Sequence, residues 1–138
     1  MFVGIAVLVT NVAAGACGAV LWLRWSFSNA FWILLRAAQA AVTVQVVLGL
    51  ILLARSAGSP DGLHLAYGVA PLLITLLSEA MRVGAAQREL QNVQDLDALT
   101  SEEQIGVARR VARAEVGVMT VGVLLILTLA LRAYQTGG

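Results

Sequence analysis

Four long apolar runs fill most of this chain, and they constrain its fold more than any other feature. They cover residues 2–23, 30–54, 63–81 and 114–133. Each holds roughly 19 to 25 residues, and at ~1.5 Å of helical rise per residue such a run crosses a hydrocarbon core of about 30 Å. The sequence therefore predicts an all-α protein: a transmembrane four-helix antiparallel bundle, with residues 1–138 as a single membrane domain.

The composition supports a membrane class and excludes nucleic-acid binding. Hydrophobic residues make up 59% of the chain and charged residues 12%, whereas a soluble domain carries about 25% charged residues. The net charge is only +1, and the chain has no basic arm or zinc-type Cys/His spacing. All nine basic residues are Arg, among many Ala, Val, Leu and Gly, which suggests a GC-rich bacterial genome and hence the bacterial cytoplasmic (inner) membrane.

The first run is expected to be a retained span and not a signal peptide. No positive charge precedes it, it is too long, and it ends in the interfacial anchor of residues 22–25. The single Cys17 lies mid-span and is expected to be a small packing residue.

Arginine placement predicts the orientation. With both termini outside, the cytoplasmic side holds seven of the nine arginines, in agreement with the positive-inside rule. These seven are Arg24, Arg36, Arg82, Arg88, Arg109, Arg110 and Arg113.

The connections differ in length. Residues 26–29 and 58–62 form short turns that force antiparallel neighbours, with Asn29 expected to cap the second helix. Residues 82–113 contain ten charged residues, with arginines at both ends and acids at the tip. Thr100 and Glu103 form a capping-box pattern. We therefore expect the third and fourth helices to extend as a cytoplasmic hairpin, which serves either as a solvated connector or as a docking surface for a partner.

Small residues should mediate packing between spans, since lipid gives apolar helices no hydrophobic reason to associate. At about 100° per residue, one face of the first span carries Gly4, Asn11, Gly15 and Gly18. The fourth span has a similar strip at Ala114, Gly117 and Val121, near Gly122. We expect Asn11 to hydrogen-bond a neighbouring helix, with a place in a ligand or ion path as the alternative.

The third span carries one polar stripe. Its members are His64, Tyr67, Gly68, Pro71, Thr75, Ser78, Glu79 and Arg82. Unpaired polar groups in hydrocarbon cost several kcal/mol, so the stripe must face the bundle interior or a wet cavity.

Two regions of this stripe are candidate sites. By depth, Arg36 of the second span and Glu115 of the fourth can join Glu79 and Arg82 in an inner-leaflet polar cluster. This cluster is either a structural ion-pair network or a substrate, lipid-headgroup or proton site. The sequence leaves open whether Arg36 pairs with Glu79 or with Glu115.

At the outer boundary, a ligand or cofactor pocket could form. Its residues would be His64, Tyr67, Gly68, Pro71 and Thr75. The alternatives are an interfacial His/Tyr pair beside a proline kink, a quinone site, a metal site with Asp61, or a haem ligand. Haem b needs two axial ligands, and Met81 and Met119 lie at the opposite end, so it requires a homodimer that pairs two copies of His64.

Around Gly62–His64, Tyr67, Gly68, Pro71, Glu79 and residues 113–119, the chain resembles uncharacterised small four-span integral membrane proteins of GC-rich actinobacteria. The resemblance covers roughly residues 60–132 and carries no assigned activity. It adds weight to His64, Tyr67, Glu79 and Glu115 without giving them roles.

No grouping of catalytic residues is recognisable, so an enzyme is not expected. The sequence favours a non-catalytic subunit or accessory protein of a membrane complex, with the lipid bilayer and a membrane-protein partner or a second copy as its partners. The alternatives are a quinone or haem binder near His64 and Tyr67, and a small transporter.

Overall fold

A computed structural model describes residues 2–26, 28–55, 62–91, 93 and 95–136, without the side chains of residues 63–65 and 136. The described chain forms four helices: α1 (Phe2–Arg24), α2 (Asn29–Arg55), α3 (Gly62–Gln91) and α4 (Ser101–Thr136). All four are long and apolar enough to cross a membrane. The predicted all-α fold is confirmed, and each predicted span lies within one helix.

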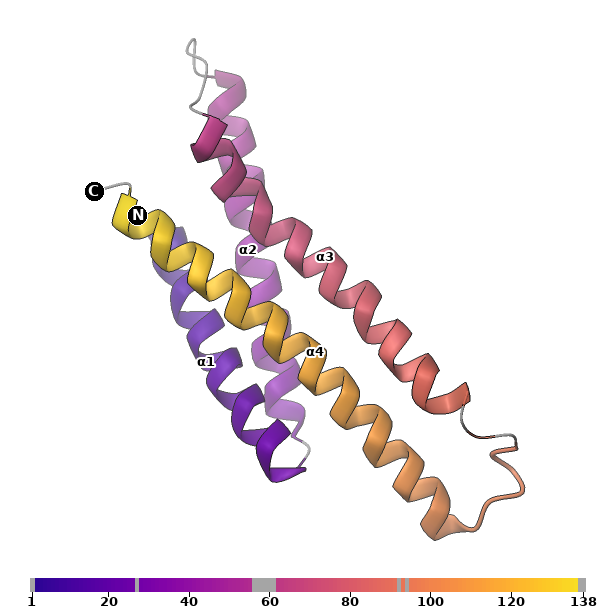
Figure 1. The fold of residues 1–138 in the computed structure, drawn as a ribbon. Coiled ribbons are helices and arrows are strands. Elements are labelled where there is room, and N and C mark those ends of the chain that lie inside the picture. Colours follow the sequence, from indigo (N-terminus) through magenta and orange to yellow (C-terminus); the bar gives the residue numbers. More distant parts are fainter. Residues whose placement is uncertain (1, 27, 56–61, 92, 94, 137–138) are drawn as a thin grey trace.

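The helices pack as a ring in chain order, with antiparallel neighbours (Figure 1). The α4 helix lies between α1 and α3, and α1 also packs on α2; among the neighbouring pairs, α2 and α3 touch least. Figure 1 shows α3 and α4 continuing together past the α1–α2 turn, while the start of α1 and the end of α4 lie at the opposite end of the bundle. Residues 82–113 are called the α3–α4 extension below.

In the α3–α4 extension, α3 ends at Gln91 and α4 begins at Ser101, so both helices continue past the predicted spans as expected. The Thr100 amide donates to Oε2 of Glu103 at 2.8 Å, and the Glu103 amide donates to Oγ1 of Thr100 at 3.4 Å. These reciprocal bonds are the predicted capping box, which satisfies backbone donors that the first helical turn leaves unpaired.

We expect Thr100→Ala to fray the first turn of α4. Loss of an N-cap side chain costs about 1 kcal/mol, so amide hydrogen exchange at Glu103 should accelerate about fivefold. Ser101→Ala is the matched control, because Ser101 is exposed and is not the cap. Equal exchange rates at Glu103 in the two variants would contradict this assignment of the cap.

The α1–α2 turn is built on an unusual backbone conformation at Trp25. Its φ of 53° lies in the left-handed region, and the Ser26 amide donates to the Leu21 carbonyl at 3.2 Å, as in a Schellman C-cap. Glycine usually occupies that position, because a bulky side chain there is strained. The turn also corrects one expectation, since Oγ of Ser28 accepts the Ala30 amide at 3.2 Å and caps α2 in place of Asn29.

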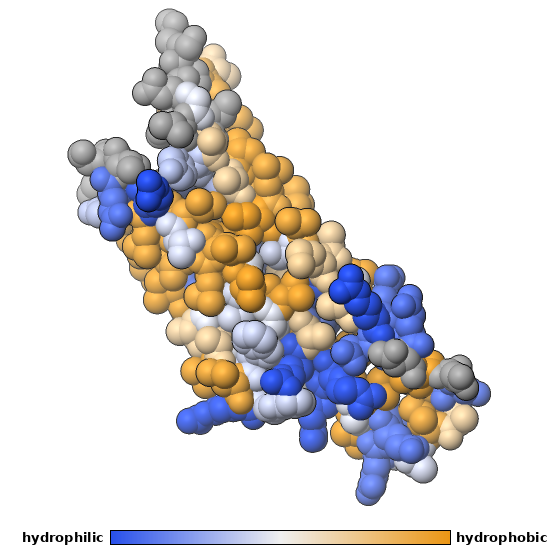
Figure 2. Space-filling view, viewed as in Figure 1, coloured by the Kyte–Doolittle hydropathy of each residue, from blue (hydrophilic) through white to orange (hydrophobic). Residues whose placement is uncertain are grey.

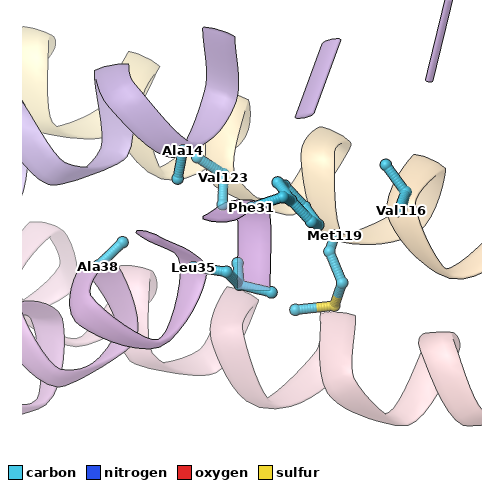
Figure 3. Close-up of a cluster of buried hydrophobic side chains, with 7 residues drawn as sticks. All are labelled: Ala14, Phe31, Leu35, Ala38, Val116, Met119 and Val123. Carbon is cyan, nitrogen blue, oxygen red and sulfur yellow. The ribbon is translucent and has the colours of Figure 1, made fainter. Parts of the chain in front are cut away.

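The core lies where α2 faces α4 inside the ring (Figure 3). Phe31 and Leu35 of α2 are fully buried against Met119 and Val123 of α4, with Ala14 of α1 beside them. A second buried cluster lies nearer the chain ends and contains Val7, Val42, Val46 and Ile126. The leucines on the outer side of α3 are exposed, as expected for lipid contact.

Small residues allow close helix contact at two seams. A Cβ atom at Gly18 of α1 would lie 2.6 Å from Cε2 of Phe31, and one at Gly122 of α4 would lie 2.9 Å from Cβ of Ser78. Gly15 is likewise buried, 3.1 Å from a Leu124 methyl by the same measure.

Two residues predicted on the same packing face behave differently. Gly4 is exposed, with nothing within 4 Å of its Cβ position, so it makes none of the predicted packing contacts in the described chain. Asn11 is buried, but Nδ2 donates to the Val7 carbonyl of its own helix at 2.8 Å. The expected bond from this amide to a neighbouring helix is wrong, because Nδ2 bonds within α1 and the buried Oδ1 has no partner in the described chain.

Candidate functional site

Four charged side chains meet at the end of the bundle from which the α3–α4 extension leaves. Arg36 comes from α2, Glu79 and Arg82 come from α3, and Glu115 comes from α4. Nη1 of Arg36 lies 2.6 Å from Oε1 of Glu79, and Nε of Arg82 lies 2.9 Å from Oε2 of Glu79. Nη1 of Arg82 then lies 3.0 Å from Oε1 of Glu115. The chain of ion pairs therefore runs from α2 through α3 to α4.

Glu79 is the centre of this cluster. Besides the two arginines, its Oε1 accepts a hydrogen bond from Nε2 of Gln39 at 2.7 Å. Oε1 of Gln39 in turn accepts from Nη1 of Arg36 at 2.7 Å. The partner of Arg36, which the sequence left open, is thus Glu79. Gln39 follows Arg36 by three residues and so lies on the same face of α2. This spacing is the sequence signal that places Gln39 near the cluster.

Arg82 also contacts an aromatic ring that the sequence did not assign to the cluster. Its guanidinium carbon lies 5.6 Å from the centroid of the Trp32 ring, within range of a cation–π interaction. Trp32 lies near the start of α2, where a tryptophan can face either the lipid headgroups or the bundle, so its position in the sequence alone does not place it in the cluster. Trp32 thus adds a further contact between α2 and α3, the neighbouring helices of the ring that touch least.

The four charges differ in exposure. The side chains of Glu79, Arg82 and Glu115 are 26%, 24% and 22% exposed, whereas that of Arg36 is 57% exposed. The two positive and two negative charges balance within the cluster. Pairing offsets the cost of removing charges from water, so the arrangement can hold three helices together at one depth.

The predicted pocket at the other end of α3 is described only in part. The Tyr67 hydroxyl accepts a hydrogen bond from Nε of Arg132 at 3.3 Å, a partner that the sequence did not identify. The Thr75 hydroxyl donates to the Pro71 carbonyl at 2.9 Å within α3. Gly68 is half-buried, with nothing within 4 Å of its Cβ position. The His64 side chain and Asp61 lie outside the described residues.

A small cavity of ≈ 10 Å³ lies in the bundle core, beside Asn11, Gln39, Thr75 and Ser78. It has room for about one water molecule. Among the described residues, no group of three His, Cys, Asp or Glu side chains is placed to hold a metal ion. The polar cluster is therefore the most developed arrangement of charged side chains in the described chain.

Four apolar helices, three of which are joined at one end by ion pairs, define a small polytopic membrane protein. Comparisons of the chain with protein-family models, with curated proteins and with solved structures find no match.

Proposed function

We propose that this protein is a non-catalytic subunit or accessory protein of a larger membrane assembly. The observation that carries the proposal is apolar surface on the α3–α4 extension, beyond the predicted spans. Leu90, Leu96 and Ile105 have exposed fractions of 40%, 43% and 58%. Figure 2 shows apolar patches at this end of the molecule among charged side chains.

Apolar side chains on the extension cannot be covered by lipid in the way that those on the spans are. Lipid covers the outer leucines of the spans, but it does not reach the tip of a helical pair that projects from the bilayer. Burial of apolar surface from water contributes about 25 cal/mol per Å², so a protein partner would gain by covering these side chains. Apolar residues within a charged rim are the usual anatomy of a protein interface.

Side-chain contacts connect the described part of the tip to the helices of the extension. Nε2 of Gln104 donates to the Leu96 and Leu99 carbonyls at 3.0 and 3.3 Å. Nε of Arg110 lies 3.6 Å from Oε2 of Glu89 across the two helices. A surface ordered before binding loses less entropy when a partner docks, which supports a docking role.

The polar cluster supports the same proposal from the other end of the extension. Its ion pairs link α2, α3 and α4 where the extension leaves the bundle, so they set the direction in which the docking surface points. The arginine distribution favours the cytoplasmic side for the extension, with both termini outside. A bacterial inner membrane is the setting that the composition favours.

The first test removes the apolar tip surface. We expect the wild-type protein, purified in mild detergent from its native membranes, to carry a second protein in fixed stoichiometry. A variant with Leu90, Leu96 and Ile105 changed to Ser should retain at least tenfold less of it, equivalent to about 1.4 kcal/mol.

The matched control changes three exposed polar residues of the same extension, Gln91, Glu102 and Arg109, to Ser. This control should retain the second protein. A wild-type protein that purifies alone or only as a homo-oligomer would contradict the proposal, as would equal retention in the apolar variant. Circular dichroism of each variant checks that the helices remain folded.

A further inference from the structure

A groove of ≈ 740 Å³ runs along α4, between α3 and the C-terminal end of α1. Its sides are apolar, and two glycines of α4, Gly117 and Gly122, contribute to its lining. The apolar side chains include Ile74, Leu77, Met81, Val118, Val121 and Leu125. The groove is thus shaped for a long apolar occupant that lies parallel to the helices.

The groove is as long as one leaflet of a bilayer. Its lining runs from Ile74 to Glu89 on α3 and from Arg110 to Leu125 on α4. Fifteen residues separate the ends in each helix, which at ~1.5 Å per residue is about 22 Å. A leaflet with its headgroups is about 20 to 22 Å thick, half of a bilayer. This match favours a single lipid molecule over an occupant that crosses the whole membrane.

The end of the groove nearest the extension is positively charged. It is lined by Arg110, Arg113 and Glu89, and Arg110 lies 3.6 Å from Glu89. Among the described residues, no carboxylate lies within ion-pair distance of Arg113. One positive charge is therefore left over at the depth where a lipid headgroup would lie.

The guanidinium of Arg113 is positioned by the Trp25 ring, with its hydrogen-bond donors available to an anion. Its guanidinium carbon lies 3.3 Å from the centroid of the Trp25 ring, and Trp25 itself lines the groove. Stacking covers one face of the guanidinium, whereas its N–H donors point outward in the plane and remain available to phosphate oxygens. The same contact gives Trp25 a partner in its left-handed conformation.

We infer that this groove binds one anionic phospholipid from the leaflet on the side of the extension. Arg113 holds the phosphate, with Arg110 beside it, and an acyl chain lies along Gly117 and Gly122 toward Leu125. Each arginine near a lipid surface raises the affinity for an anionic headgroup over a neutral one by about fivefold. This inference does not depend on the proposed partner protein.

Tryptophan quenching tests the inference. Trp22 and Trp25 line the groove, so a Trp32→Phe protein reports on it through these two residues. Reconstituted into vesicles, its fluorescence is measured against increasing fractions of phosphatidylglycerol with brominated chains, and separately of phosphatidylcholine with the same chains. We expect half-maximal quenching at a roughly fivefold lower fraction of the anionic lipid.

Further substitutions in the Trp32→Phe protein test whether the lipid preference comes from the groove or from general contact with the membrane. Arg113→Gln should abolish the preference for phosphatidylglycerol, and Arg110→Gln should weaken it. Arg88→Gln, on α3 but outside the groove lining, should retain it. If Arg113→Gln does not fold, judged by circular dichroism, the comparison of Arg110→Gln with Arg88→Gln decides.

Three results would overturn the inference. The first is equal quenching by the two lipids in the Trp32→Phe protein. The second is an equal loss of preference in the Arg88 and groove variants. The third is weak quenching by both lipids together with a second protein chain that cross-links to Ala85 in the groove, which would assign the groove to a partner helix.

Discussion

Replacement of Glu79 by alanine is expected to destabilise the bundle by about 2 to 3 kcal/mol. Glu79 accepts hydrogen bonds from Arg36, Gln39 and Arg82. Without it, two arginines lose their shared counterion. Removal of one member of a fully buried ion pair costs about 3 to 5 kcal/mol, and the quarter exposure of this carboxylate reduces that cost.

Glu89→Ala is the control for this prediction, because Glu89 is also an α3 carboxylate paired with an arginine of another helix. Its partner Arg110 is 3.6 Å away and half exposed, so its loss should cost about 1 kcal/mol or less. Unfolding of both variants in detergent micelles by titration with sodium dodecyl sulfate, followed by circular dichroism, measures the difference. Equal destabilisation by the two substitutions would contradict a central role for Glu79.

Gly18→Val is expected to destabilise the protein by about 3 kcal/mol, at the upper end of the usual cost of overpacking. A Cβ atom there would lie 2.6 Å from Cε2 of Phe31 and would also clash with Oγ1 of Thr120. Phe31 is fully buried among α1, α2 and α4, so it has no space into which to move. The α1 helix would have to shift away from both α2 and α4.

Gly4→Val provides the matched control on the same helix. Nothing lies within 4 Å of the Cβ position at Gly4, so this change should alter the free energy of unfolding by about 0.5 kcal/mol or less. The same denaturant titration compares the two variants. A Gly18 variant as stable as the Gly4 variant would show that the α1–α4 seam is looser than described.

The spans and the extension could be predicted because their signals are local. Length and hydropathy identify a membrane helix, and the Thr100–Glu103 spacing identifies a cap from four residues alone. Periodicity also grouped Glu79 and Arg82 on one face of α3. Depth below the boundary then placed Arg36 and Glu115 at the same level, which is where the structure brings them together.

The remaining features depend on how the helices are rotated about their axes. Periodicity puts Gly4 and Gly18 on one face, but only Gly18 is buried, because no neighbouring side chain reaches within 4 Å of the Gly4 Cβ position. The choice of Glu79 over Glu115 for Arg36 follows from the ring order, in which α2 neighbours α3. The contact of Trp25 with Arg113 joins residues 88 positions apart, and no local pattern encodes it.

A nitroxide scan of α3 from Leu72 to Arg82 tests most directly whether the polar stripe faces the bundle interior. The scan uses a Cys17→Ala background reconstituted into lipid vesicles. Collision with dissolved oxygen, which concentrates in the hydrocarbon core, should oscillate with the helical period. Maxima are expected at Leu73, Leu76 and Leu77, which are about 60% exposed, and minima at Thr75 and Ser78, which are 9% and 7% exposed. Minima at the leucines and maxima at Thr75, Ser78 and Glu79 would contradict an inward-facing polar stripe, and high accessibility to a water-soluble relaxant along the whole segment would contradict a membrane bundle.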